Sequence, residues 1–356
     1  MVVDTRVFSK KETGDVNQAS VAEAFDGTDQ LLKEYSKCGN FQDVKAVLLK
    51  IRQSIPTKNG IKILHKIVID PHDSRQLVVA QILGYHREWL NVSNGIRVHL
   101  DLIRKTKNDS SVTEALVWGL RQREEISEYL LHPSESVARE AALGVPLGRR
   151  TIFPILDRIR KSSSSEITRI LLLKLRNLHP SLMQFVLAAL VEDTWTEGAV
   201  IKLFSALPQT SVFDFFIDKE VVVGDLTFDI GKNSRWHSAV RIAKEVLISD
   251  PSSELIKVLL VRSGDDELFS RRQAAFTRSV MRSVGGESGR ELMKDFKTLT
   301  LGASEEKVFR LAESLVELGS RLDGESAKKI QAMLEEWKSR SAALKLKIYQ
   351  LEQRIV

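Results

Sequence analysis

The stretch Ser74–Gly84, SRQLVVAQILG, sets a pattern of a polar or basic start followed by small apolar residues that returns along the chain. Val137–Gly144 repeats it as VAREAALG, and related runs begin near Ile167, Ser234 and Ser270. With weaker matches included, the units start at residues 74, 110, 135, 165, 196, 234, 270 and 305. A spacing of roughly 25 to 40 residues is typical of two-helix units that stack to share one apolar core. We therefore predict an all-α protein, an α-solenoid of two-helix repeats.

The repeats predict one elongated body with distinct ends. We expect residues 1–28 to form a polar leader and residues 29–324 to form the solenoid, whose functional face is the concave surface lined by the second helices. Residues 221–233 contain β-branched residues, two glycines and acidic residues, so we expect an inserted loop or small hairpin there. The charged helical run over residues 325–356 is typical of a C-terminal capping helix.

Composition excludes several classes of protein. The 356 residues are 43% hydrophobic and 28% charged, and no apolar run approaches the roughly 20 residues that span a bilayer. The leader lacks a basic start followed by an apolar stretch, so it does not predict a signal peptide. Cys38 is the single cysteine, which excludes an internal disulfide and a cysteine-ligated zinc site. We expect a cytoplasmic monomer without a membrane anchor.

The sequence lacks a glycine-rich phosphate loop, paired histidines at metal spacing and a serine nucleophile elbow. We therefore expect no cofactor and no metal. The net charge of +6 and the sequence pI of about 9.2 favour a phosphate-bearing partner. One predicted helix carries candidate DNA-binding residues, for which a solvated surface is the equal alternative: Arg271, Arg272, Arg278 and Arg282.

A mid-chain junction between two predicted helices combines an aromatic ring with a carboxylate. Trp195 and Glu197 open the second helix of a repeat, shortly after the apolar run from Phe185. Thr194 or Thr196 can cap that helix, and Glu197 falls in its first turn, where the helix dipole favours a negative charge. A capped helix with a packing tryptophan is the structural alternative to a functional site.

The repeat length and the arginine followed by small apolar residues resemble HEAT repeats. In that family such an arginine pairs with an acidic neighbour in an adjoining repeat. The resemblance implies structural ion pairs for Arg75, Arg139 and Arg169, with phosphate contact as the alternative. It also makes the predicted solenoid one of HEAT-like two-helix repeats.

Residues 150–290 resemble a more specific family, the HEAT-like alkylpurine DNA glycosylases. The family motif is an apolar helix, a short polar turn and the sequence Trp-Trp-Asp. Trp195 matches the first tryptophan, Thr196 replaces the second, and Glu197 replaces the aspartate. The substitutions affect the expected substrate more than the expected fold.

The following repeats supply further candidates for substrate binding. Trp236 matches a tryptophan that the family places on the second helix of the next repeat. Arg235 or Arg241 can supply the accompanying charge, although neither stands at the family spacing. Phe276 is the nearest match to an aromatic residue expected one repeat later. Aromatic faces can stack on a sugar or base and attract a cationic ring.

The resemblance implies a monofunctional DNA glycosylase that hydrolyses the N-glycosidic bond of a modified base in duplex DNA, in repair or in defence against modified DNA. Glu197 would stabilise the positive charge that develops on the deoxyribose, with Asp193 or Asp229 as the next candidate. Thr196 in place of a tryptophan opens the pocket for a bulkier or differently modified base than a simple methylpurine. A non-catalytic HEAT-repeat scaffold for a protein partner and a nucleic-acid binder without catalysis are the alternatives.

Overall fold

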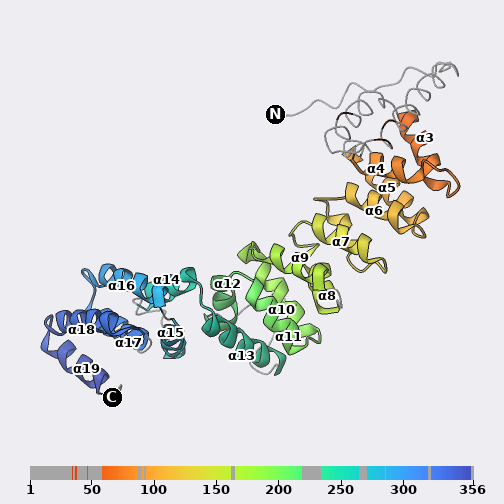
Figure 1. Ribbon diagram of the computed structural model, residues 1–356. Coiled ribbons are helices and arrows are strands. Elements are labelled where there is room, and N and C mark those ends of the chain that lie inside the picture. Colours follow the sequence, from red (N-terminus) through yellow and green to blue (C-terminus); the bar gives the residue numbers. More distant parts are fainter. Residues whose placement is uncertain are drawn as a thin grey trace, which may run out of the picture. The chain divides into compact units, whose positions relative to one another are not determined.

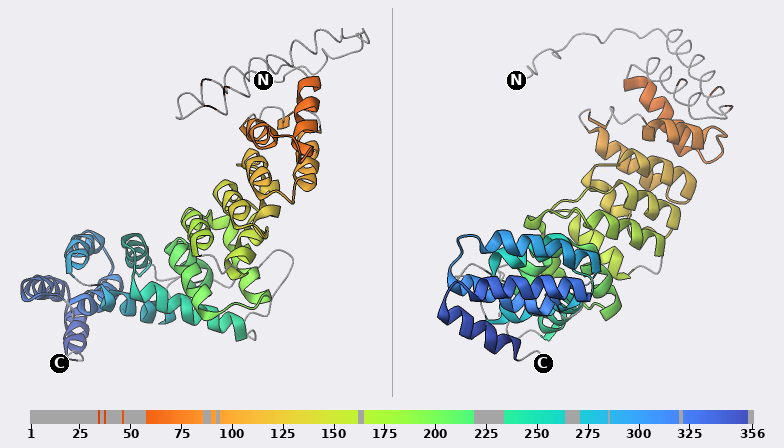
Figure 2. Two further views of the ribbon diagram at one scale, coloured as in Figure 1. Left: turned by 45° about the vertical axis from the view of Figure 1, so that its right-hand side comes forward. Right: turned by 60° about the vertical axis from the view of Figure 1, so that its left-hand side comes forward.

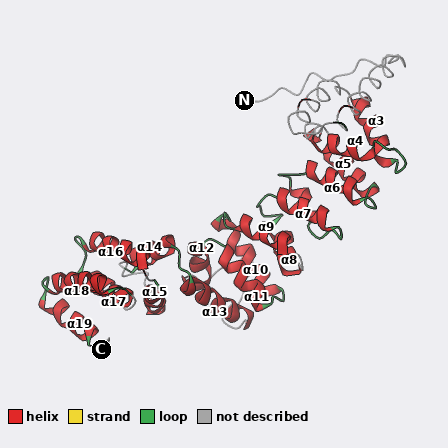
Figure 3. Ribbon diagram, in the orientation of Figure 1, coloured by secondary structure: helices red, strands yellow, loops and turns green. Residues whose placement is uncertain are grey.

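The computed structural model divides into two compact units, residues 1–146 and 147–356 (Figure 1). All regular structure in the described residues is helical (Figure 3), so the all-α prediction is confirmed. The predicted leader, the predicted insertion 221–233 and the candidate Asp229 lie outside the described residues. The described residues are 34, 37, 46, 58–85, 90–91, 94–161, 165–218, 234–263, 271–284, 286–319 and 322–353.

Unit 1 consists of short helices joined by tight turns. At the start of one of them, the Asp109 carboxylate accepts hydrogen bonds from the backbone N–H groups of Ser111 at 2.9 Å and Val112 at 3.1 Å. Such an N-cap satisfies donors that have no partner within the helix. The described helices of this unit are α3 (Lys58–Ile69), α4 (Gln76–Tyr85), α5 (Gly95–Lys105), α6 (Ser110–Gly119), the 3-10 helix η2 (Glu124–Tyr129) and α7 (Glu135–Gly144).

Helices α4 and α6 approach closely because glycines stand at their contact. A Cβ atom on Gly84 would lie 2.2 Å from the carbonyl oxygen of Ala115, and a Cβ on Gly119 would lie 3.0 Å from the Cα of Gly84. The buried His99 of α5 lies beside this contact, with its Nε2 at hydrogen-bonding distance, 2.8 Å, from the carbonyl oxygen of Leu116. Burial lowers the pKa of His99 to about 4. The imidazole is therefore neutral at pH 7.

A partly buried ion pair joins the end of α6 to α7. Arg121 donates from Nε and Nη2 to the two carboxylate oxygens of Glu140, the second hydrogen bond being 2.8 Å long, and its guanidinium lies 5.2 Å from the centre of the Trp118 ring. By contrast, Arg75 pairs with Asp73 in its own turn, through contacts of 3.0 and 2.9 Å. An arginine at the end of α6 and a glutamate of α7 therefore pair, but from a position that the sequence pattern did not single out.

Unit 2 also consists of helices joined by turns. A proline opens one of them: Pro180 is the first residue of η3, where its missing N–H has no cost. The described helices of this unit are α8 (Ile152–Lys161), α9 (Ser165–Leu175), η3 (Pro180–Leu182), α10 (Met183–Glu192), α11 (Glu197–Ala206), α12 (Gln209–Phe213), the π-helical turn η4 (Asp214–Asp218), α13 (Ser234–Ser249), α14 (Ser253–Arg262), α15 (Arg271–Ser283), α16 (Gly286–Thr300), α17 (Glu305–Gly319), α18 (Gly324–Lys338) and α19 (Ala342–Glu352).

The helices of unit 2 contact one another in two parallel series. In one series α9, α11, α13, α15, α17 and α19 each contact the next. In the other, α8 contacts α10, and α12, α14, α16 and α18 each contact the next. Figure 2 gives two further views of these helices. Each predicted repeat start lies within two residues of the start of a helix, namely α4, α6, α7, α9, α11, α13, α15 or α17. In unit 2 the sequence repeat therefore marks helices of the first series.

The C-terminal segment forms two helices where the sequence predicted one. The α18 helix ends at Lys338, and Ser341 caps α19 by accepting a hydrogen bond from the backbone N–H of Leu344 at 3.0 Å. Serine favours such caps over helix interiors, which explains the break. Lys338 is almost fully buried between the helices and donates to Glu335 at 2.9 Å and Glu352 at 2.6 Å.

Candidate functional site

The junction between α10 and α11 forms as the sequence predicted. Asp193 ends α10, and Thr196 caps α11 by accepting a hydrogen bond from the backbone N–H of Ala199 at 3.3 Å. Of the two threonines considered, Thr196 is therefore the cap. Glu197 is the first residue of α11, where the positive end of the helix dipole favours its carboxylate.

Trp195 is held in place by the end of the preceding helix. Its indole N–H donates to the carbonyl oxygen of Ala189 at 3.1 Å. Arg235, at the start of α13, donates to two carbonyl oxygens of the same helix end, Val191 at 3.2 Å and Glu192 at 2.6 Å. Cations and donors at a helix C-terminus satisfy carbonyl groups that lack a partner within the helix. Both side chains thus stabilise the α10–α11 turn.

Glu197 forms an ion pair with the next helix of its series. Its Oε1 accepts a hydrogen bond from Nη2 of Arg241 at 2.8 Å, and the same guanidinium binds Glu245 at 2.8 Å. Hydrogen bonding to Glu197, then to Glu245, raises the pKa of Arg241. All three side chains are more than half exposed, so water and salt screen the interaction. The carboxylate of Glu197 is accessible, but its charge is already matched.

A cavity of about 260 Å³ lies beside this junction, among α10, α11 and α13. Four of the predicted site residues line it, namely Asp193, Trp195, Glu197 and Arg235. Its volume is close to the lower end of the range for small-molecule sites. The remaining lining residues are Leu190, Thr194, Val200, Ser238, Ala239 and Ile242.

The other predicted aromatic residues pack against phenylalanines. Trp236 stacks on Phe216 of the π-helical turn, with ring centres 5.3 Å apart and planes at 20°. Phe276 is 5% exposed and stacks on Phe213 at 5.6 Å. Phe216 also meets Phe204 edge to face at 4.9 Å. These rings contribute packing between helices of unit 2, and neither Trp236 nor Phe276 lines the 260 Å³ cavity.

Two of the four predicted DNA-binding arginines of α15, Arg278 and Arg282, contact carboxylates of α17. Nη1 of Arg278 lies 3.5 Å from Glu313, and Arg282 binds both oxygens of Glu317 at 2.8 and 3.0 Å. The hydrogen bonds to Glu317 raise the pKa of Arg282. Arg271 and Arg272 begin α15, and their side chains lie outside the described structure.

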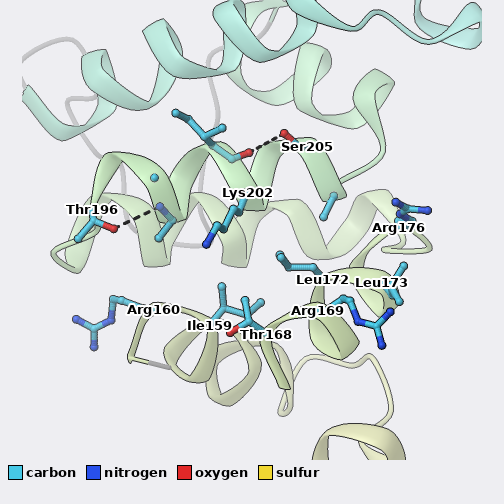
Figure 4. Close-up of a pocket in the computed structure, with 14 residues that line it drawn as sticks. Ile159, Arg160, Thr168, Arg169, Leu172, Leu173, Arg176, Thr196, Lys202 and Ser205 are labelled. Atoms are coloured by element: carbon cyan, nitrogen blue, oxygen red, sulfur yellow. Dashed lines mark hydrogen bonds between the residues drawn. The ribbon is translucent and has the colours of Figure 1, made fainter. Parts of the chain in front are cut away.

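A larger hollow, of about 690 Å³, lies between α9 and α11 (Figure 4). Arg160, Arg169, Arg176 and Lys202 line it, and no acidic residue does. In Figure 4, Lys202 extends from α11 between Arg160 at one end and the other two arginines at the other. Sequence reasoning named Arg169 only as a structural ion-pair residue and missed Arg160, Arg176 and Lys202, although Arg176 follows Arg169 by seven residues, a spacing typical of one helix face.

No protein-family model matches the chain, and no curated protein matches it. Across the described residues, no three or more histidine, cysteine, aspartate or glutamate side chains gather in a way that could hold a metal ion. None of the described helices combines the length and the apolar character needed to cross a membrane. The assignment of function therefore depends on the geometry of the two hollows.

Proposed function

We propose that the chain is an α-solenoid of HEAT-like two-helix repeats that acts as a non-catalytic scaffold for a protein partner. The repeat spacing supports the solenoid, as do the two series of helix contacts in unit 2. A repeat that contacts only its neighbours leaves long surfaces open for extended or helical partners.

The ion pair between Glu197 and Arg241 is the main observation that favours a scaffold over a glycosylase. A carboxylate that stabilises a developing cation has to direct its charge at the reacting atoms. In this protein the carboxylate of Glu197 is directed at a guanidinium. The ring of Trp236, which the glycosylase resemblance places near a substrate, packs on Phe216.

The second candidate function is excision of a modified base from duplex DNA. The cavity favours it, because Trp195, Asp193 and Arg235 line that cavity together with Glu197. In this function Glu197 would lie against the deoxyribose and stabilise its positive charge as the N-glycosidic bond breaks. The guanidinium of Arg241 would first have to leave the carboxylate, for example toward a phosphate group.

The two functions differ in what happens to modified DNA. Duplexes carrying alkylated and bulky bases are incubated with the wild type and with Glu197→Gln, and alkali then cleaves any abasic sites. The scaffold proposal expects no strand cleavage with either protein. Base release by the wild type that falls about 10²-fold in Glu197→Gln would reject the scaffold and establish the glycosylase.

A further inference from the structure

We infer that the hollow between α9 and α11 is the docking site for an acidic amphipathic helix of a protein partner. We call it the cationic groove and define it by Arg169, Arg176 and Lys202 together with the apolar Leu173 and Ile201. The inference rests on the proposed scaffold function and names the chemistry of the partner.

The groove has an apolar floor that remains in contact with water. Leu173 of α9 is 45% exposed and Ile201 of α11 is 40% exposed. Leu172 and Ala206 extend the same surface. Large apolar side chains that meet in a concave surface favour a partner that can cover them, and an amphipathic helix does so with its apolar face.

The cations at the groove are not neutralised within the described part of the chain. Arg169, Arg176 and Lys202 are exposed and form no ion pair with a described residue. Arg160 differs, because Asp157 lies 2.7 Å away and Asp193 3.6 Å away. Three positive charges beside apolar side chains complement a helix with glutamates or aspartates flanking its apolar stripe.

The charge distribution favours a peptide over a nucleic acid. A duplex presents phosphates along its whole length, so a protein that holds it supplies cations along an extended track. On the helices that follow α11 in its series, the cations Arg241, Arg278 and Arg282 are each paired with carboxylates. The unpaired cations of the groove stand beside exposed apolar side chains, from which phosphates gain nothing.

The test uses the full chain and a fluorescent synthetic peptide of about four helical turns. The peptide carries Leu at i, i+3, i+4 and i+7 spacing and Glu elsewhere, and a second peptide has the same composition in scrambled order. Binding is measured by fluorescence anisotropy at low and moderate salt, alongside a labelled DNA duplex. The wild type should bind the ordered peptide and not the scrambled one.

Two double variants probe the two parts of the groove. Arg169→Gln with Lys202→Gln should weaken binding of the ordered peptide about tenfold, and Leu173→Ser with Ile201→Ser should weaken it at least as much. Lys244→Gln with Lys257→Gln is the charge-matched control, since both lysines are exposed, lie outside the groove and form no ion pair with a described residue. This control should bind as the wild type does.

Three outcomes would overturn the inference. They are equal affinity for the ordered and scrambled peptides, no measurable binding of the ordered peptide, and duplex binding that depends on Arg169 and Lys202 but not on Leu173 and Ile201. The last outcome would assign the groove to nucleic acid. Failure of the peptide leaves the scaffold proposal standing, because that proposal depends separately on whether Glu197 supports cleavage of modified DNA.

Discussion

The close contact between α4 and α6 predicts a large effect from a single methyl group. In Gly84→Ala the new Cβ would lie 2.2 Å from the carbonyl oxygen of Ala115, which belongs to the backbone and cannot rotate away. The helices have to separate by about 1 Å to restore a normal contact, and the buried side chains around them then lose dispersion contacts. Such overpacking costs about 1–3 kcal/mol.

Alanine also stabilises a helix by about 1 kcal/mol relative to glycine, so part of this cost is offset. We therefore expect the free energy of unfolding to fall by about 0–2 kcal/mol, centred near 1 kcal/mol, which is roughly 5 °C in Tm for a domain of about 100 residues. Circular dichroism during heating measures the change. Hydrogen exchange of peptides from α4 and α6 should locate it in unit 1.

Gly324→Ala is the matched control, because a Cβ at the start of α18 would meet no atom within 4 Å. Its stability should stay unchanged or rise by up to about 1 kcal/mol. If Gly84→Ala unfolds at the wild-type temperature and its α4 and α6 amides exchange hydrogen at the wild-type rate, the two helices do not approach each other this closely.

Three further predictions concern unit 1. Burial holds the pKa of His99 at about 4, below the unfolded value of 6.5. The free energy of unfolding should therefore be highest above pH 6.5 and fall by about 3 kcal/mol toward pH 4. Urea unfolding at both ends of this range measures the fall, and His99→Gln should make the free energy of unfolding less dependent on pH. Glu140→Gln should lower the free energy of unfolding by about 1–3 kcal/mol because it leaves Arg121 without its carboxylate, and a urea midpoint equal to wild type would refute this. Asp109→Ala removes the α6 cap and should cost about 1 kcal/mol in the same assay, whereas Asp109→Asn should retain most of that stability.

The sequence predicted where the helices begin better than how their side chains meet. The predicted starts were accurate because the apolar period and the turn residues act locally, and Thr196 could be named as a cap for the same reason. The ion pair of Glu197 with Arg241 joins residues 44 positions apart, and no local signal specifies that distance. Trp236 likewise depends on Phe216, which an unpredicted π-helical turn brings beneath it.

The cationic groove illustrates a different limit. Its charges come from separate segments of the chain, and the sequence pattern marked Arg169 for a structural ion pair but did not mark Arg176 or Lys202. The packing of α9 beside α11 brings them to one surface, where no described carboxylate pairs with them. On α15, where arginines are denser along the sequence, Arg278 and Arg282 contact glutamates instead. Local density of charge is therefore a poor guide to free charge on stacked helices.

The burial of Lys338 makes the docking of α19 measurable by chemical modification. Amine acylation needs an accessible, unprotonated nitrogen. The ammonium of Lys338 is shielded on both sides by Glu335 and Glu352, and it lies 4.2 Å from the ring of Tyr349. Burial alone would lower its pKa, but the hydrogen bonds to Glu352 and Glu335 outweigh burial and raise it. Acylating reagents should therefore spare this lysine while α19 is docked and modify it as soon as α19 detaches.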